Sequence, residues 1–296
     1  MNYIDNVFRA LNNSSYYNTK NYMMFQEAVS DDDSSELTTA IADIIEKSKR
    51  PVVKINVSKG CYAKEFDSFL FGLPKYIEGE IPTMPDGNQM RFMAQINFAD
   101  VNGLPDYPTS GILQIWMHVD KYKSFWDFKN GEEHKIIYIP NPASSKNNID
   151  NVNIDKSIYV QQLADFPDFN DGTADKNYRM TFNNITEESV AGSDINIVRK
   201  YITNELNARG MDIDKYSKLF KDGQFKCDAW GTKIGGYPAF TQGGIPDFEV
   251  RDTLLLQIDS CDQFMWGDSG IANFFISHDD LVNKNFNNVE FYWDCC

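Results

Sequence analysis

The chain closes with a stretch that decides its fold, LLLQIDSCDQFMWGDSGIANFFISHDDL at residues 254–281. The mostly apolar run at 254–260 is typical of a buried strand. Glycine, aspartate and serine dominate the segment MWGDSG at 265–270, and these residues favour tight turns. A second apolar run follows at 271–276, and the polar residues Ser277 to Asp280 resemble a helix cap. The stretch therefore predicts a strand, a tight loop, a second strand and the start of a helix.

Parts of this stretch occur earlier in the chain. The matched pieces are Gly72-Leu73-Pro74 with Gly236-Tyr237-Pro238, Gln95-Ile96 with Gln257-Ile258, and Ser110-Gly111-Ile112 with Ser269-Gly270-Ile271. Their offsets fall from 164 to 162 to 159 residues, so the loops between matched elements are shorter in the second copy. Loops are where deletions are tolerated. The sequence therefore predicts a duplicated unit. Two copies favour a pair related by a pseudo-two-fold axis over a solenoid.

Hydrophobic periodicity predicts an α+β fold. Helices are expected at 35–48 and 194–208, where apolar residues recur at one-face helical spacing, and strands are expected at 52–57, 91–98, 111–119 and 136–139. Short helices are also predicted at 4–11 and 212–220. Helices and strands do not alternate strictly, and hairpin-like pairs of strands recur. This order favours an antiparallel β-rich core built from the duplicated unit and flanked by a few helices.

We expect residues 1–296 to form a single globular domain made of two related halves. The first half covers about 52–140 and the second about 158–296, and an N-terminal helical segment covers 1–50. Between the halves, residues 140–157 are rich in Asn, Ser, Asp and Pro, a composition typical of a linker or surface excursion.

The chain is strongly acidic, with 43 Asp and Glu against 28 Lys and Arg and a net charge of −15. Binding to nucleic acid requires a basic surface, so this charge argues against nucleic acid and against anionic membranes. No apolar run approaches the roughly 20 residues of a membrane span, and the first residues lack the pattern of a signal peptide. We expect a soluble, cytoplasmic protein whose partner has a basic surface. The oligomeric state stays open.

The cysteine pattern favours free thiols. The five cysteines are Cys61, Cys227, Cys261, Cys295 and Cys296. An odd number without a Cys-x-x-Cys pair favours a reducing compartment over a disulfide framework. The close ligand spacing of a zinc site is absent, so no metal or cofactor is expected.

Standard catalytic signatures are missing from the sequence. It contains no nucleophile elbow, zinc-protease helix, phosphate-binding loop or dinucleotide fingerprint. The three histidines, His118, His134 and His278, are scattered along the chain. We interpret them as structural or surface residues.

Two sets of polar residues are binding candidates. Gln95 and Gln257 occupy equivalent positions in the repeat, where they either satisfy buried backbone groups or hold a ligand at the pseudo-axis. Asp259, Trp266 and Asp268 form the second set. Carboxylates beside an aromatic ring are typical of glycosidases, and clustered oxygens suit hard cations. The same residues are also typical of turns in which carboxylates cap backbone N–H groups, so both interpretations stay open.

Several blocks together resemble the YwqG-like family, a bacterial family of unknown function. The blocks are Phe92–Asn97, Ser110–Gln114, Gly235–Pro238, Leu254–Ser260 and Met265–Phe275. The resemblance runs from about Leu73 to the C-terminus and is weak over 140–190. Cys261 departs from the pattern, because family members often carry an acidic residue there. The resemblance implies an α+β fold with a duplicated β-rich unit, and it implies no activity, substrate or catalytic residue.

The leading hypothesis is a non-catalytic binding or protein-interaction module, one version of which is an immunity or neutralising factor against a basic protein. The alternative is a hydrolase, or a small-ligand or glycan-binding protein, that uses an acidic cleft near Asp259, Trp266 and Asp268.

Overall fold

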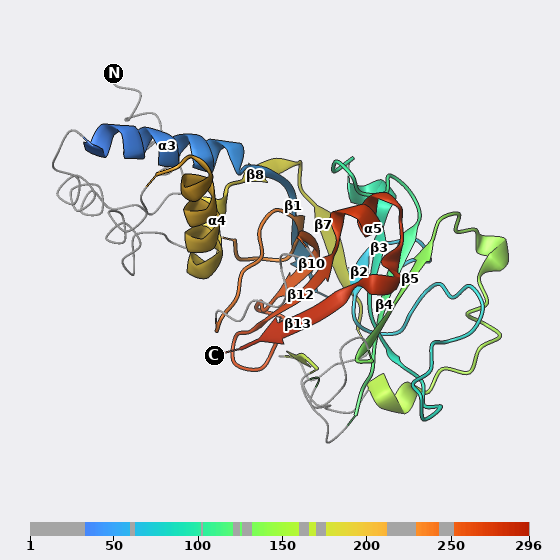
Figure 1. Cartoon of the computed structure of the whole chain (residues 1–296). Coiled ribbons are helices and arrows are strands. Elements are labelled where there is room, and N and C mark those ends of the chain that lie inside the picture. The colour runs from blue at the N-terminus through green and yellow to red at the C-terminus, as the bar shows by residue number, and fades with distance from the viewer. Residues whose placement is uncertain are drawn as a thin grey trace. The chain divides into compact units, whose positions relative to one another are not determined.

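The structure, a computed structural model, describes residues 33–59, 63–101, 103–120, 125, 132–159, 166–169, 176–211, 229–242 and 252–295 (Figure 1). Its contacts divide the chain into two compact units. The first falls within Met1–Arg50, Glu187–Trp230 and Tyr237–Ala239, and the second within Pro51–Thr186, Gly231–Gly236 and Phe240–Cys296. The helices predicted at 4–11 and 212–220 lie outside the described residues, as do Cys61, Cys227 and Cys296.

The first unit contains two helices, α3 (Asp33–Lys47) and α4 (Ile195–Ala208). Their apolar stripes pack together in one cluster that includes Leu37, Ile41, Ile44 and Ile45 of α3 and Val198, Ile202 and Leu206 of α4. The α4 helix begins after Asp194, whose side chain accepts a hydrogen bond from Asn196 N at 2.9 Å. Such a cap satisfies one of the free N–H groups of the first turn. The helices predicted at 35–48 and 194–208 are thereby confirmed to within two residues.

The second unit is built on a large antiparallel sheet. Its strands are β1 (Arg50–Ser58), β2 (Phe69–Leu70), β3 (Arg91–Asn97), β4 (Ile112–Met117), β5 (His134–Ile139), β7 (Tyr178–Phe182), β9 (Lys233–Gly235), β10 (Thr253–Asp259), β12 (Ile271–Ile276) and β13 (Glu290–Asp294). They lie in the order β13-β12-β10-β9-β1-β7-β2-β3-β4-β5. A three-residue strand, β8 (Thr186–Glu188), falls at the division between the units. A separate pair is formed by β6 (Asp168–Phe169) and β11 (Phe264–Met265).

Short helical turns connect these strands. They are η1 (Phe98–Val101), η3 (Ser144–Lys146), η4 (Lys156–Tyr159), η5 (Val190–Gly192), α5 (His278–Val282) and η7 (Phe286–Asn288).

The two ends of the sheet meet, so that the sheet is nearly closed. His134 Nε2, at the start of β5, lies 3.0 Å from Val289 O, just before β13. A carbonyl oxygen only accepts, so the ring nitrogen donates this hydrogen bond. On the same seam the rings of Tyr138 and Phe286 pack with centroids 5.0 Å apart. Joining the ends in this way covers two edges that would otherwise expose unpaired backbone groups.

The central strands β3, β4, β10 and β12 are buried on both faces. Nearly every residue of the four is buried. The large core cluster includes Ala94, Ile96, Leu256 and Ile258. Phe69, Phe92 and Trp116 belong to a second cluster. Burial on both faces explains why these strands read as near-continuous apolar runs in the sequence.

The β3–β4 and β10–β12 hairpins have the same register. In the first, pairing shifts between Phe92 and Ala94, and in the second it shifts between Leu254 and Leu256. Each hairpin places its glutamine opposite an amide side chain. Gln95 pairs with Gln114, and Gln257 pairs with Asn273. Equal registers are what a duplicated unit predicts. The pseudo-two-fold relation, and the division into halves at 52–140 and 158–296, stay predictions.

The predicted class is confirmed at the level of an antiparallel β-rich fold with few helices among the described residues. Within the same described ranges, no helix combines the length and apolar character that crossing a membrane requires.

Gly111 is required by both conformation and space. Its φ is +92°, and an added Cβ would lie 2.8 Å from the backbone oxygen of Ile139. Gly87 has nearly the same φ of +86° but nothing within 4 Å of that position. We expect Gly87→Ala to cost about 1 kcal/mol of unfolding free energy through its backbone alone. Gly111→Ala should cost about 2 kcal/mol more, because the backbone of β5 must move. Urea unfolding of both variants measures the difference, and equal losses would contradict the close packing at Gly111.

Candidate functional site

One hydroxyl group makes two of the hydrogen bonds that hold the loop between β10 and β12. Ser260 Oγ donates to Gly270 O at 2.7 Å and accepts from Trp266 N at 2.9 Å. Gly270 N in turn donates to Trp266 O at 2.7 Å. Gly267 has a φ of +49°, and a Cβ there would lie 2.8 Å from Cys295 Sγ. The sequence Gly-Asp-Ser-Gly thus forms a tight, internally bonded turn.

Trp266 lies inside the main core. Its side chain is fully buried, and its ring packs 6.3 Å from that of Trp293. A sugar platform needs one exposed aromatic face, which this ring does not present. The indole Nε1 is buried without a hydrogen-bond partner, so the position serves packing more than polar recognition.

Asp259 and Asp268 lie in different surroundings. Asp259 is half-buried, and its Oδ2 accepts from Gly231 N at 2.6 Å. Burial raises the pKa of Asp259, while hydrogen bonds from Gly231 and Ser260 and the charge of Lys233 oppose that rise. Asp268 is exposed in the turn. The carboxylate of Asp259 therefore acts first as an acceptor for backbone, as the turn interpretation expects.

Gln257 completes the attachment of Gly231 to β10. It is fully buried, and its Nε2 donates to Gly231 O at 2.8 Å. Asp259 holds the N–H of the same residue. Two side chains of one strand therefore satisfy both backbone groups of Gly231, which fixes the approach to β9.

Gln95 has the matching role in the first hairpin. It is fully buried, and its Nε2 donates to Glu65 O and Asp67 O, both at 2.9 Å. Its Oε1 accepts from Gln114 Nε2 at 2.9 Å. With these three bonds the side-chain amide is well satisfied by protein groups, in line with the usual state of buried amides.

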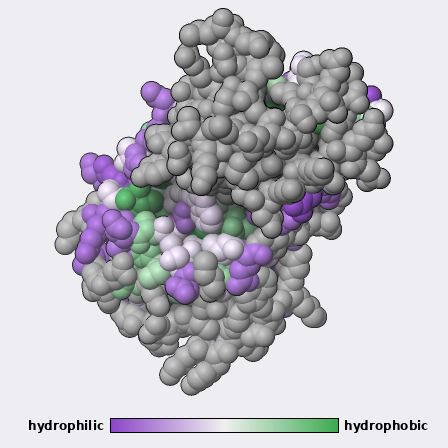
Figure 2. All heavy atoms as spheres, turned by 90° about the vertical axis from the view of Figure 1, so that its left-hand side faces the viewer, coloured by the Kyte–Doolittle hydropathy of each residue, from purple (hydrophilic) through white to green (hydrophobic). Residues whose placement is uncertain are grey.

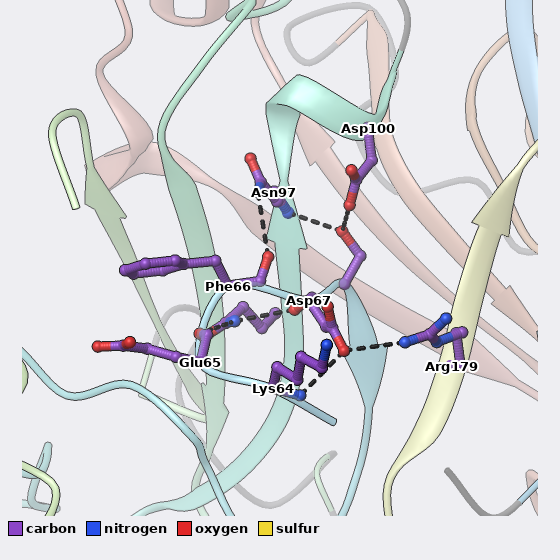
Figure 3. A network of polar contacts seen from close by, with 9 residues as sticks. Lys64, Glu65, Phe66, Asp67, Asn97, Asp100 and Arg179 are labelled. Atoms are coloured by element: carbon purple, nitrogen blue, oxygen red, sulfur yellow. Dashed lines mark hydrogen bonds and ion pairs between the residues drawn. The ribbon is translucent and has the colours of Figure 1, made fainter. Parts of the chain in front are cut away.

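Around Gln95 the structure shows a polar network that secures the segment before β2 (Figure 3). Asp67 Oδ2 accepts from Lys64 N at 2.9 Å and pairs with Arg179 at 3.0 Å. Asn97 Nδ2 donates to Phe66 O at 3.0 Å. In Figure 3, Asn97 of β3 reaches the backbone of Phe66, and Arg179 of β7 reaches the carboxylate of Asp67. The network stabilises a loop.

The histidines and cysteines do not gather into a metal site within the described ranges. There, no cluster of three or more His, Cys, Asp or Glu is placed to hold a metal ion. His134 lies in the sheet seam beside Glu133, with Nδ1 and Oε1 3.1 Å apart. Cys261 is half-buried, and burial raises the pKa of its thiol. A raised pKa reduces the thiolate fraction and with it the reactivity.

Sequence reasoning missed several buried charged residues, among them Arg91 on β3, Lys233 on β9 and Asp294 on β13. Lys233 is fully buried and Asp294 is 3% exposed. A signal was present in the repeat. Lys233 stands 164 residues after Phe69, and Asp294 pairs with Ile271 as Ile139 pairs with Ile112. In the alignment that the repeat predicts, Lys233 and Asp294 stand opposite apolar residues.

A family model, Domain of unknown function (DUF1963), matches residues 68–295. The chain belongs to this family. The DUF1963 region includes both hairpins and every candidate residue discussed above. No curated protein matches the chain significantly. Membership of DUF1963 thus describes ancestry and leaves the activity to be argued from the residues.

Asp259 provides a pH test of its structural role. Its folded pKa is raised by burial, so the folded state binds that proton more tightly than the unfolded chain. The contribution of Asp259 to the unfolding free energy should then fall as pH rises from about 4, the unfolded value. We expect the stability of wild type relative to Asp259→Asn to decrease between pH 4 and 7, as measured by urea unfolding. Asp268→Asn controls for the loss of one charge. A difference that grows with pH would indicate an ion pair at Asp259.

Proposed function

We propose that this DUF1963 protein is a non-catalytic module that binds a protein partner with a basic surface. The observation that carries the proposal is the distribution of charge. Residues 252–295 contain eight Asp and Glu side chains, one lysine and no arginine. Concentrated charge of one sign attracts partners of the opposite sign and speeds their association.

Three of these carboxylates are well placed to meet a partner. Asp262 and Asp268 are exposed in the loop between β10 and β12, and Asp279 is exposed on α5. Among the described residues, neither Asp268 nor Asp279 takes part in an ion pair. On the face drawn in Figure 2, hydrophilic and hydrophobic residues of the described chain are interspersed.

Two of the binding candidates, Asp259 and Trp266, speak against an acidic catalytic cleft at this loop. Asp259 is engaged by a backbone N–H, and Trp266 is enclosed by the core. The alternative of a hydrolase, or a small-ligand or glycan-binding protein, finds no support in these positions. One version of the proposed function is an immunity or neutralising factor that covers a basic protein. The resemblance to the YwqG-like family is consistent with DUF1963 membership and adds no activity.

We also infer that β2 to β5 and β9 to β13 are two copies of one unit, related by a pseudo-two-fold axis. Support comes from the shared register and from a shared backbone feature. Phe71 and Gly72 both have positive φ, as do Gly235 and Gly236 at the matching positions. In this view the two copies bury charges at different positions, Arg91 in the first and Lys233 and Asp294 in the second.

The test is capture of partners from a lysate of the protein's own host, followed by affinity measurements. We expect the capture to recover a basic protein. Its Kd should increase as the salt concentration rises from 50 to 200 mM, because salt screens exposed charges. Replacing Asp268 and Asp279 together by asparagine should weaken binding about tenfold, at about 0.5–1 kcal/mol for each charge.

The matched control is Glu80→Gln with Asp150→Asn, which removes two exposed charges outside residues 252–295. It should leave Kd unchanged. Recovery of no protein partner at low salt would overturn the proposal, as would equal weakening by both double variants. A sugar, nucleotide or amino acid that raises the Tm of wild type but not of Asp268→Asn would favour the alternative instead.

A further inference from the structure

Asp294, at the end of β13, is a buried carboxylate that is satisfied on one side only. Its Oδ2 accepts from Thr241 N at 3.0 Å and from Gln242 N at 2.8 Å. Its Oδ1 is buried without a hydrogen-bond partner, although the residue is only 3% exposed. The hydroxyl Oγ1 of Thr241 is also buried without one. Two unsatisfied oxygens thus belong to residues that already touch, and buried polar atoms in proteins usually have a partner.

The first hairpin indicates that the fold itself does not need this charge. The residue matching Asp294 by register is Ile139. Thr241 stands five residues after Gly236, as Ile77 stands five residues after Gly72. Ile77 N donates to a neutral amide oxygen, Asn147 Oδ1, at 3.1 Å. A neutral acceptor is therefore enough to hold this loop, and the second copy has replaced two isoleucines with oxygen-bearing side chains.

No side-chain cation neutralises Asp294 within the described part of the chain, where no ion pair includes it. The segment that carries it, residues 252–295, is acidic and contains a single lysine. Tyr292 is affected as well, because burial and then the charge of Asp294 raise its pKa. A buried carboxylate without a compensating charge is unfavourable, which leaves room for a positive ion from solution.

We propose that Asp294 Oδ1 and Thr241 Oγ1 are protein ligands of a hard cation. Both atoms are oxygens, the donor type that sodium, potassium and calcium prefer over sulfur or nitrogen. Thr241 is half-buried and Gln242 is exposed, so water reaches the margin of the site and completes the coordination. A site with a single carboxylate suits an alkali ion, or a calcium ion that binds weakly. The bound cation fastens residues 240–242 to the last strand of the sheet.

The test compares wild type with Asp294→Asn by thermal unfolding in NaCl, KCl, MgCl₂ and CaCl₂, with tetramethylammonium chloride keeping ionic strength constant. Wild type should gain about 5–10 °C in Tm with its preferred ion at about 100 times Kd. Asp294→Asn should fold, because its amide oxygen still accepts from both N–H groups and the buried side chain no longer carries a charge. It should show no response to any of the ions.

Two further variants decide between a site and general screening of charge. Asp268→Asn removes an exposed carboxylate of the same segment and should keep the full response. Thr241→Val removes one ligand and should weaken the affinity about tenfold in calorimetric titration with the same ion. If Asp294→Asn fails to fold, the Thr241→Val titration decides, and wild-type affinity there overturns the site. A wild type whose Tm responds to none of the four salts overturns it too, since a proton or water then satisfies Oδ1.

Discussion

Burial of both faces of β3, β4, β10 and β12 is the constraint on which the rest of this structure depends. A strand covered on one side can turn its polar residues to water, but these strands cannot. Every polar group on them must find a partner inside the protein or leave an unfavourable buried atom. Gln95 and Gln257 meet this demand by bonding to the backbone of the segments that precede β2 and β9. The same bonds that satisfy the amides also set the positions of those segments.

The two hairpins meet the constraint in different ways. In the first, the side-chain amides of Gln95 and Gln114 bond to each other. Beside the second, the strands β9 and β13 carry the buried charges of Lys233 and Asp294. Charges are costly to bury, and both parts of the sheet bury some, because Arg91 of β3 is only 1% exposed. Asp294 leaves one carboxylate oxygen buried without a hydrogen-bond partner, so a role beyond folding is best sought there.

Exposed and buried carboxylates act over different distances in this protein. In the proposed binding role, exposed acids such as Asp268 and Asp279 extend a negative field into solvent, and such a field attracts basic partners and weakens with salt. Buried acids act at short range. Asp259 holds Gly231, and Asp294 holds residues 241 and 242. Trp266, which the sequence places beside both acids, contributes apolar contact in the core. The acidic residues near the C-terminus therefore fall into two groups, exposed ones that face solvent and buried ones that hold backbone segments. The two groups lie close together in the sequence, so the sequence alone does not separate them.

The sequence by itself determined the antiparallel β-rich class, the two helices at 35–48 and 194–208, and the matched hairpins. These depend on periodicity, caps and turn residues, which act over a few positions. Only the tertiary structure decided that Trp266 is enclosed, that Asp259 faces Gly231, that the sheet nearly closes at His134, and that Asp294 meets Thr241. Each of these is a contact between residues far apart in the chain or a question of which side of a strand is covered. Local patterns carry no information on such contacts, because burial is a property of the folded chain as a whole.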